Sequence, residues 1–293
     1  MTIARTIRHV DAFTTTPLEG NPAAVVDGEG LSGETMQRIA RNQHLSETVF
    51  LLLPRSRENH AHIRIFTPGT ELPFAGHPTI AASHTLIGEG RVSLAPGESL
   101  RIETGAGVIP VEVSVGEQPL YTMTQAAPQF RPCEFGMDVI AASAGLDARD
   151  ILRAEWVSTG IYWLIAQVAS LEAMLRVRPD MMALMKIPHG LTIFCIGAQS
   201  TDAGIHVRAF APDAGVFEDP VTGSSNGCIA AFIAKHGLMP ARDGEIRYVS
   251  EQGIEIGQPG RVHLRVTGVP DALSVHVGGH AVTVLRGELL LAD

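Results

Sequence analysis

The sequence contains little cysteine and no cluster of positive charge, and each shortage excludes a class of protein. Its three cysteines, Cys133, Cys195 and Cys228, are far apart and form no CxxC pair. An odd number of scattered cysteines fits free thiols in a reducing compartment rather than a disulfide framework. Lys and Arg together number 22 against 31 Asp and Glu, which gives a net charge of −9. Nucleic acid is therefore not expected as a partner, because phosphate binding depends on clustered Lys and Arg.

Long apolar runs are missing as well. The first residues, MTIARTIRHVDAF, have no apolar core of signal-peptide length, and no run approaches the ~18 apolar residues of a membrane span. We therefore expect a cytoplasmic protein with no membrane partner. The 293 residues are enough for one large domain or for two of ordinary size.

An internal repeat is the main feature that the sequence does contain. RIFTP (64–68) recurs as RAFAP (208–212), with Arg, Phe and Pro each 144 positions later. The preceding segments, SETVFLL (46–52) and LTIFCIG (191–197), are typical of buried β-strands because they are rich in β-branched and apolar residues. A chance recurrence of RxFxP would not bring its flanking segments with it, so we interpret the repeat as a duplication.

Helical segments repeat around these strands. Amphipathic helices are predicted ahead of the paired strands, at 33–43 and 178–186, with Pro179 near the start of the second. Two Ala-rich helices follow the strands, at 76–90 and 223–237, and both are apolar nearly all round, as a helix wrapped by a sheet must be. Each ends at a glycine suited to the left-handed position past a helix end.

These segments predict an α/β (α+β) fold of two pseudo-twofold-related lobes, each a sheet wrapped around a central apolar helix. We place the first lobe at residues 1–124 and the second at 125–280. The segment 125–136, with its two prolines, is the natural connector. The sequence leaves open whether the last strand, within 281–293, joins the first lobe.

Glycine and short polar residues stand at the start of both central helices. The first helix begins Gly76-His77 and the second begins Gly223-Ser224-Ser225. Unpaired N–H groups in a first helical turn bind anions, so two such ends in one crevice would hold a small carboxylate or stabilise an enolate formed beside it. Ser224 alone is more typical of an ordinary N-cap. The recurrence of polar helix ends in both halves is what favours the binding interpretation.

Glu47 supplies a titratable group in a suitable place. It stands in NQHLSETVF, where a predicted helix is followed by a strand. In an apolar crevice the pKa of its carboxyl would rise, and the group could then take and return protons near neutral pH. A surface glutamate at the start of a strand fits the spacing equally well.

Asp219 precedes the second central helix, in VFEDPVTGSS. The following Pro220 biases its backbone toward extended conformations. A solvated turn acid that favours the helix dipole would occupy the same position, and a lone His77 is typical of a hydrogen bonder at a helix start. Taken together, Glu47, His77 and Asp219 describe a crevice with carboxylates, an imidazole and two donor-rich helix ends.

Four motifs, in order along the chain, carry a family resemblance: GNPAAVV (20–26), LSETVF (45–50), RIFTPGTELPFAGHP (64–78) and FAPDAGVFEDPVTGSSNG (210–227). The sequence resembles the PhzF-like family of phenazine biosynthesis, which has the diaminopimelate-epimerase-like fold. The resemblance implies a homodimeric isomerase, free of cofactor and metal, that acts on a small carboxylated substrate in the cleft between its lobes. It also implies that Glu47 is the acid/base group and that His77, Asp219 and Ser224 support it, with Asp219 bonding the substrate or His77.

Other chemistries stay open as alternatives. Related epimerases use a thiol at each helix end, but FAGHP and VTGSSNG contain no cysteine, and Cys228 lies inside an apolar helical run, where it is expected to be a packed free thiol. An epimerase or racemase using Glu47 against Asp219 remains possible, as does a non-catalytic member that binds metabolites or proteins. His60 and His62 are interpreted as surface histidines of a strand rather than metal ligands.

Overall fold

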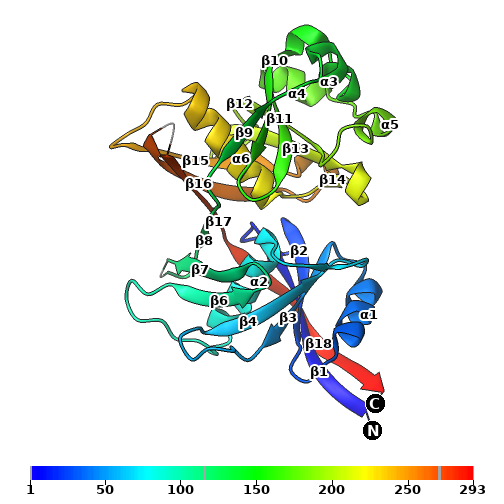
Figure 1. Ribbon diagram of the computed structural model, residues 1–293, viewed down its shortest axis with the longest axis vertical. Coiled ribbons are helices and arrows are strands. Elements are labelled where there is room, and N and C mark those ends of the chain that lie inside the picture. The colour runs from blue at the N-terminus through cyan, green and yellow to red at the C-terminus, as the bar shows by residue number, and fades with distance from the viewer. Residues whose placement is uncertain (1, 115, 270–271, 293) are drawn as a thin grey trace. The chain divides into compact units, whose positions relative to one another are not determined.

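The computed structural model describes residues 2–114, 116–269 and 272–292, which form two compact units (Figure 1). Unit 1 combines Met1–Met123 with Gly279–Asp293, and unit 2 is the continuous stretch Thr124–Gly278. The chain therefore leaves unit 1, builds all of unit 2, and returns to unit 1 for its last strand. Among the described residues, no helix is long and apolar enough to cross a membrane.

Unit 1 is built from strands with two helices between them. Its elements are β1 (Thr2–Ala12), β2 (Asn21–Asp27), α1 (Gly33–Gln43), β3 (Glu47–Leu52), β4 (Ala61–Phe66), β5 (Glu71–Leu72), α2 (Gly76–Gly88), β6 (Leu100–Thr104), β7 (Gly107–Val113), β8 (Tyr121–Thr124) and β18 (Ala281–Ala292).

Unit 2 follows the same plan with more short helices. Its elements are β9 (Gln129–Pro132), α3 (Met137–Ser143), η1 (Ala148–Asp150), β10 (Ile151–Ser158), β11 (Tyr162–Val168), α4 (Leu171–Arg176), α5 (Met181–Leu184), β12 (Leu191–Ile196), β13 (Ile205–Ala211), η2 (Pro212–Ala214), β14 (Val216–Asp219), α6 (Gly223–His236), β15 (Glu245–Gln252), η3 (Ile254–Ile256), β16 (Gly260–Val269) and β17 (Ala272–Gly279).

The strand pairings of the two units are the same in order and direction. In unit 1, β2 runs parallel to β3, β3 is antiparallel to β4, β4 is antiparallel to β5 and parallel to β6, and β6 is antiparallel to β7. In unit 2, β11, β12, β13, β14, β15 and β16 repeat those five relations. The shared pairing shows that the repeated sequence is a repeated fold.

A central helix lies against the sheet in each unit. Helix α2 contacts β1, β2, β3 and β18, and α6 contacts β10, β11 and β16. Both helices are buried along most of their length, and several of their polar side chains bond to backbone carbonyls of their own helix. Thr79 Oγ1 and Ser83 Oγ, for example, donate to carbonyl oxygens one turn earlier, each at 2.7 Å. The predicted α/β fold, a sheet around a central apolar helix, is confirmed within each unit.

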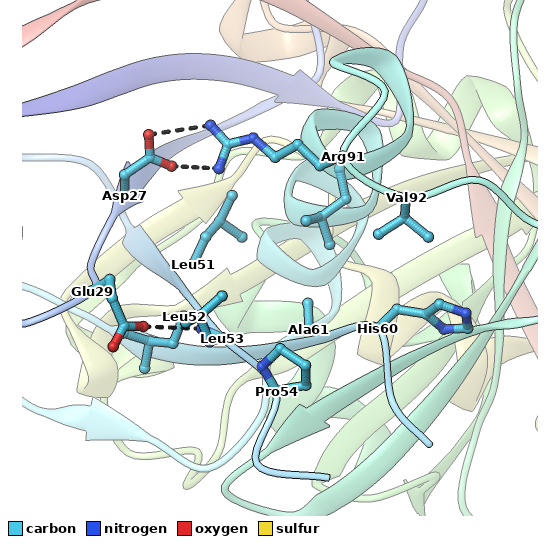
Figure 2. A pocket seen from close by; sticks show the side chains of 11 residues that line it. Asp27, Glu29, Leu51, Leu52, Leu53, Pro54, His60, Ala61, Arg91 and Val92 are labelled. Carbon is cyan, nitrogen blue, oxygen red and sulfur yellow. Dashed lines mark hydrogen bonds and ion pairs between the residues drawn. The ribbon is translucent and has the colours of Figure 1, made fainter. Parts of the chain in front are cut away.

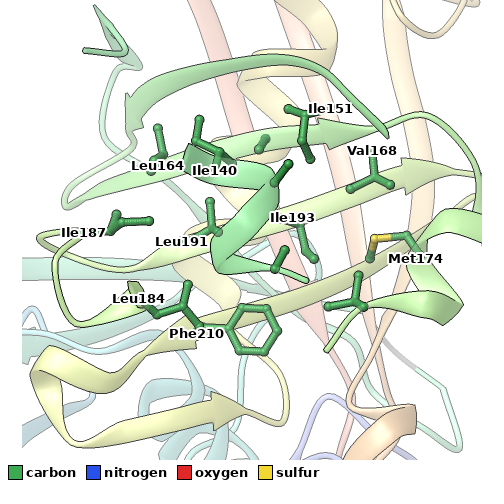
Figure 3. Packing of buried hydrophobic residues seen from close by; sticks show 14 of the residues in the cluster. Ile140, Ile151, Leu164, Val168, Met174, Leu184, Ile187, Leu191, Ile193 and Phe210 are labelled. Atoms are coloured by element: carbon green, nitrogen blue, oxygen red, sulfur yellow. The ribbon is translucent and has the colours of Figure 1, made fainter. Parts of the chain in front are cut away.

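Further helices cover the other face of each sheet. In unit 1, α1 packs its Met36 and Ile39 onto a cluster of strand residues that includes Phe50. In unit 2, α3, α4 and α5 cover the sheet through a larger cluster, to which Ile140 and Met174 contribute (Figure 3). The two apolar faces of each sheet explain why its strands are nearly continuous runs of buried residues.

Two local predictions differ from the structure. A single helix was expected at 178–186, but helix α5 begins only after Asp180, whose carboxylate accepts the backbone N–H groups of Met182 and Ala183 as an N-cap. A separate short helix, α4, precedes it. The expected connector at 125–136 contains β9, which pairs with β10, and Pro132 stands at the end of that strand, where a missing N–H is tolerated.

Candidate functional site

Glu47 is placed by the junction between α1 and β3. Helix α1 ends at Gln43, and its C-cap, His44, adopts the left-handed conformation with φ 54°. Strand β3 then begins at Glu47, which stands opposite Ala23 of the parallel strand β2. The Glu47 side chain is only 16% exposed. The carboxylate is therefore mostly withdrawn from solvent within unit 1 and does not resemble a surface glutamate at the start of a strand.

The start of α2 brings an imidazole to this carboxylate. His77 Nε2 lies 3.1 Å from Glu47 Oε2 in an ion pair, and the His77 side chain is only 10% exposed. Ser46 Oγ lies 3.4 Å from the same nitrogen. Two of the predicted catalytic residues are thus in contact within unit 1. The sequence suggested both residues but gave no indication of this direct pair.

The pKa of Glu47 departs from its usual value in the direction opposite to the one predicted. Burial by itself raises it, but the charge of His77 and hydrogen bonds from His77 and Ser46 outweigh burial, so the pKa lies below its usual value. The expectation of a raised pKa was wrong because it considered burial alone. A carboxylate that is ionised at neutral pH is a base that can accept a proton.

Gly76, the first residue of α2, has open space beside it. A Cβ added there would meet no atom within 4 Å among the described residues. The N-cap, Ala75, has no side chain that could bond the first turn, and no such bond is found in the described part of the chain. Helix α2 therefore begins without a capping side chain, as an anion site requires.

The acidic pair before α6 separates into two roles. Asp219 Oδ2 accepts a 2.6 Å hydrogen bond from the hydroxyl of Thr222, the N-cap of α6. Glu218 instead accepts two hydrogen bonds of 2.8 Å from the guanidinium of Arg208, a buried residue of β13. Asp219 therefore belongs to the helix start, whereas Glu218 neutralises a buried charge.

The pair formed by Arg208 and Glu218 explains the repeated arginine of RxFxP. In unit 1 the equivalent Arg64 donates two hydrogen bonds of 2.7 Å to Glu71. In both units the arginine lies on one strand and the glutamate on the next, antiparallel strand. The arginine of the motif therefore forms a structural ion pair in each unit, which the sequence alone did not reveal.

The remaining predicted residues lie in the first turn of α6. Ser224 Oγ accepts a 3.1 Å hydrogen bond from the indole Nε1 of Trp163. Ser225 is fully buried, and its hydroxyl bonds the carbonyl oxygen of Thr222 at 3.3 Å. These bonds hold both serines close to Gly223 at the helix start. Substrate binding by Gly76, Gly223, Ser224 and Ser225 stays a prediction.

One residue of this region was missed entirely. Gln252, the last residue of β15, is fully buried and bonded to the start of α6. Its signal in the sequence is weak, because a polar residue at the end of a strand is ordinary. Only the fold brings residue 252 beside residue 222.

Cys228 is a packed thiol, as predicted. It is fully buried inside α6 and is a free cysteine, and its Sγ donates to the carbonyl oxygen of Val157 at 3.3 Å. Burial raises the pKa of the thiol to about 12. Such a thiol is almost wholly protonated at neutral pH and is a poor base or nucleophile.

The interpretation of His62 as a surface histidine was wrong. His62 is buried, with 6% of its surface exposed, and His206, its counterpart 144 positions later, is fully buried. Burial, the largest cause, and the nearby Arg55 lower the pKa of His62. His60, just before β4, is partly exposed. Strand β4 is covered on both faces, which the alternation of the sequence did not indicate.

A pocket of about 340 Å³ in unit 1 is set apart from these residues (Figure 2). Leucine, proline and valine side chains make up much of its wall. The charged groups at its rim already have partners: Arg91 bonds Asp27 at 2.7 Å and Glu29 accepts the N–H of Leu53 at 3.0 Å. None of the predicted site residues is among its described lining residues.

Comparison with known proteins extends over almost the whole chain. The sequence model of the PhzC-PhzF family, described as "Phenazine biosynthesis-like protein", matches residues 10–287. A curated relative, trans-2,3-dihydro-3-hydroxyanthranilate isomerase of Pseudomonas aeruginosa, is 36% identical, and the match covers 96% of this chain and 98% of the relative.

Solved structures give the same result. A phenazine biosynthesis protein of the PhzF family from Bacillus anthracis has a TM-score of 0.89 and 34% identity, over 99% of this chain and 100% of that one. A hydroxyproline epimerase from Agrobacterium vitis has a TM-score of 0.64 and 15% identity, over 98% and 91% of the two chains. The epimerase shares the fold alone.

Proposed function

This chain belongs to the PhzC-PhzF family of phenazine biosynthesis-like proteins, and from that premise we propose that it is an isomerase in which Glu47 moves a proton. The substrate is a small carboxylated molecule, and the double bond of that molecule shifts as the proton moves. One observation carries the proposal: Glu47 is held ionised in a mostly buried position by His77 at the start of α2. Membership of a family of isomerases agrees with it.

The proposed reaction balances without a cofactor or a metal. The Glu47 carboxylate removes a proton from one carbon, and the electron pair left behind forms the new double bond as the old one opens. The protonated Glu47 carboxyl exchanges its proton with solvent, and it then delivers a proton to the carbon at the far end of the shifted system, on the same face. His77 stabilises the carboxylate before and after transfer, because an imidazolium beside it favours the charged form.

The first turns of α2 and α6 have a binding role in this proposal. N–H groups at the start of a helix attract a carboxylate and stabilise the enolate character that develops during proton removal. Gly76 and Gly223 let the backbone approach the ligand, and Ser224 and Ser225 keep the second helix start polar. Asp219 accepts a hydrogen bond from a donor group of the substrate.

The test is proton exchange in deuterated solvent. Trans-2,3-dihydro-3-hydroxyanthranilate, the compound named for the Pseudomonas aeruginosa relative, serves as the first probe. We expect Glu47→Gln to abolish both turnover and solvent deuterium incorporation, while small carboxylates still bind. Glu71→Gln is the matched control, because Glu71 is a glutamate of the same unit whose carboxylate pairs with Arg64 rather than with His77. Full activity of Glu47→Gln would refute the assignment.

The same assay separates the alternative reaction. An epimerase that works with Glu47 against Asp219 would incorporate deuterium at a stereocentre and lose optical rotation without any shift of a double bond. A protein that only binds metabolites would incorporate no deuterium into any candidate acid. Ultraviolet absorbance and rotation measured in one sample, beside deuterium incorporation, therefore distinguish the three outcomes.

The protein is further proposed to act as a homodimer in the cytoplasm. The family resemblance supports the dimer, and three free cysteines, two of them fully buried, are compatible with a reducing compartment. Sedimentation velocity should give a mass near twice the 31.2 kDa of one chain. A monomer at micromolar concentration would contradict the dimer.

A further inference from the structure

Gln252 uses all the hydrogen-bonding capacity of its side chain at the start of α6. Its Oε1 accepts the backbone N–H of Thr222 at 3.1 Å and the side-chain Nδ2 of Asn226 at 2.9 Å. Its Nε2 donates to the carbonyl oxygen of Asp219 at 2.9 Å and to Thr222 Oγ1 at 3.0 Å. An amide offers two donors and an oxygen with two lone pairs, so these four bonds satisfy it completely. Gln252 and Asn226 are both fully buried.

The neighbours of Gln252 fix which way its amide points. A backbone carbonyl can only accept, so the end of the Asn226 amide that lies 3.0 Å from Thr222 O must be its NH₂ group, and Ser250 Oγ donates to the other end, Oδ1, at 2.5 Å. That NH₂ faces Thr222 O and Gln252 Oε1. The oxygen of Gln252 therefore points to Asn226, and its nitrogen points to the hydroxyl of Thr222.

This orientation also sets the direction of the next hydrogen bond. Thr222 Oγ1 accepts from Gln252 Nε2, and a hydroxyl has only one proton to give. That proton goes to Asp219 Oδ2, at 2.6 Å. Asp219 Oδ2 is thus the acceptor of this bond. The chain of bonds runs from Gln252 through Thr222 to Asp219.

Helix α2 starts without this arrangement. At the equivalent position its N-cap is Ala75, which has no hydroxyl. The residue at the end of β6, the counterpart of β15, is Thr104, and its hydroxyl bonds within its own turn, to Gly107 O at 2.8 Å. Among the described residues, a buried side-chain amide bonded to the helix start is therefore found at α6 and not at α2, although the strands around both helices pair alike.

We propose that Gln252 is a positioning residue of the active site: it anchors the start of α6 and directs the Thr222 hydroxyl toward Asp219, so that Asp219 is held as an oriented acceptor for a donor group of the substrate. The catalytic part of this proposal rests on the proposed function. The anchoring part concerns the fold of unit 2 alone and is tested separately.

Gln252→Glu tests the direction of the bonds. It keeps the size of the side chain and the acceptor for Thr222 N–H, but an ionised glutamate has no donor. The Thr222 hydroxyl then turns toward residue 252 and leaves Asp219. We expect kcat/KM to fall on the order of 100-fold at pH values above the pKa of the introduced carboxyl, which burial raises, because a small misplacement near the chemistry produces a loss of that size. Below the pKa of the introduced carboxyl the protonated group again has a donor, so activity relative to the original protein should recover in acid.

Gln252→Leu tests the anchoring without any assay of turnover. Loss of the acceptor should speed hydrogen exchange of the Thr222 amide roughly tenfold, about the worth of one hydrogen bond. Gln167→Leu is the matched control. Gln167 is another buried glutamine of unit 2, on β11, and its Oε1 has no partner among the described residues. Its replacement should leave the Thr222 amide unchanged.

The outcomes are distinct. Faster exchange in Gln252→Leu together with a loss in Gln252→Glu that recovers in acid supports the proposal. Unchanged exchange of the Thr222 amide overturns it, whatever the enzyme does. Full activity of Gln252→Glu at every pH overturns the directing role. If the original protein turns over no substrate, the proposed function fails, and the exchange measurement still decides whether Gln252 anchors α6.

Discussion

At the scale of single residues, the contact between Glu47 and His77 decides the protonation of the proposed base. Burial raises the pKa of the Glu47 carboxyl and the His77 imidazole lowers it. The effect of His77, together with a hydrogen bond from Ser46, is the larger. A group that must both take and return a proton needs a carboxyl that is ionised at the start but can still be protonated. The contact with His77 supplies the first condition, and burial favours the second.

Removing the His77 imidazole should raise the pKa of Glu47. In His77→Gln we expect the pKa of Glu47 to rise, because burial is then opposed only by weaker hydrogen bonds. The acid limb of the pH–rate profile should move to higher pH with it. Carbon-13 NMR titration of the Glu47 carboxyl measures the change directly.

His84→Gln is the control for that titration. His84 lies on the same helix and packs edge-on against Tyr121, with ring centroids 6.0 Å apart. It is not among the groups that influence Glu47. Equal titration of Glu47 in the original protein and in His77→Gln would show that the ion pair does not control the carboxyl.

At the scale of elements, His206 joins β13 to β15 and η3. Its Nδ1 lies 2.7 Å from Glu251 Oε1 and its Nε2 lies 2.8 Å from Glu255 Oε1. Glu251 also accepts the backbone N–H groups of Gln199 and Ser200. With a carboxylate on each ring nitrogen, His206 is satisfied as an imidazolium that donates both protons.

The charges of this cluster give unit 2 a pH window of stability. Burial alone would lower the pKa of His206, but bonds to Glu255 and Glu251 raise it overall. The pKa values of both glutamates are lowered: burial opposes this, but bonds from His206 and, for Glu251, from Ser200 prevail. Two further groups face the cluster. Arg208 acts on Glu255, and Cys195 is a thiol whose pKa burial raises to about 12.

The free energy of unfolding should therefore decline at both ends of the pH range. The contribution of His206 is complete below its unfolded pKa, near 6.5, and is lost as pH rises through its higher folded pKa. The contribution of the glutamates is complete above their unfolded pKa, near 4.5, and is lost as pH falls through their lower folded pKa. Urea unfolding at a series of pH values, followed by circular dichroism, measures the window.

Two variants test whether the cluster around His206 causes this pH dependence of stability. His206→Gln should cost about 3–5 kcal/mol near neutral pH, because Glu251 is left as a buried charge without its cation, and should remove the alkaline decline. His62→Gln is the control in unit 1, where burial lowers the pKa of the histidine instead. An alkaline decline that persists in His206→Gln would assign it to another group.

At the scale of the whole molecule, the sequence predicts the duplication well because identical spacing survives in the strands. RIFTP and RAFAP, 144 positions apart, lie on β4 and β13 and the residues just after them, and these strands have equivalent neighbours in their two units. Beyond these strands the offset changes. Arg64 bonds Glu71 seven residues later, whereas Arg208 bonds Glu218 ten residues later. The three residues of η2 lie in that longer connection, so a constant offset could not pair the two glutamates.

The sequence proposes the residues of the candidate site but not their electrostatics. Glu47 and His77 follow from motifs, yet their contact depends on where α2 starts relative to β3, which spacing does not give. The same holds for Gln252, 30 positions from the threonine that it anchors. The pKa shift of Glu47 combines the effects of burial, nearby charge and hydrogen bonds, so the direction of the shift could not be obtained from burial alone.

The two units differ in whether one continuous fragment of the chain contains all their strands. Unit 2 is continuous, so a fragment of residues 124–278 retains β9 to β16, all but the last residue of β17, and its own core. Unit 1 needs β18, which pairs with β1 along its length, from Ala12 opposite Ala281 to Arg5 opposite Leu289. We expect the fragment 124–278 to unfold cooperatively in urea, and the fragment 1–123 to lack a cooperative transition because β1 keeps β2 but has lost β18, its other partner strand.

A circular permutant supplies the decisive comparison for unit 1. Because β1 and β18 are antiparallel, the end of β18 lies beside the start of β1, with Thr2 opposite Ala292. A short turn can therefore join residue 293 to residue 1 in a chain that begins at residue 279 and ends at residue 123. This permutant should recover the cooperative transition that the fragment 1–123 lacks. Equal unfolding of the two would show that β18 adds nothing to unit 1, and that the return of the chain is not what stabilises this half of the molecule.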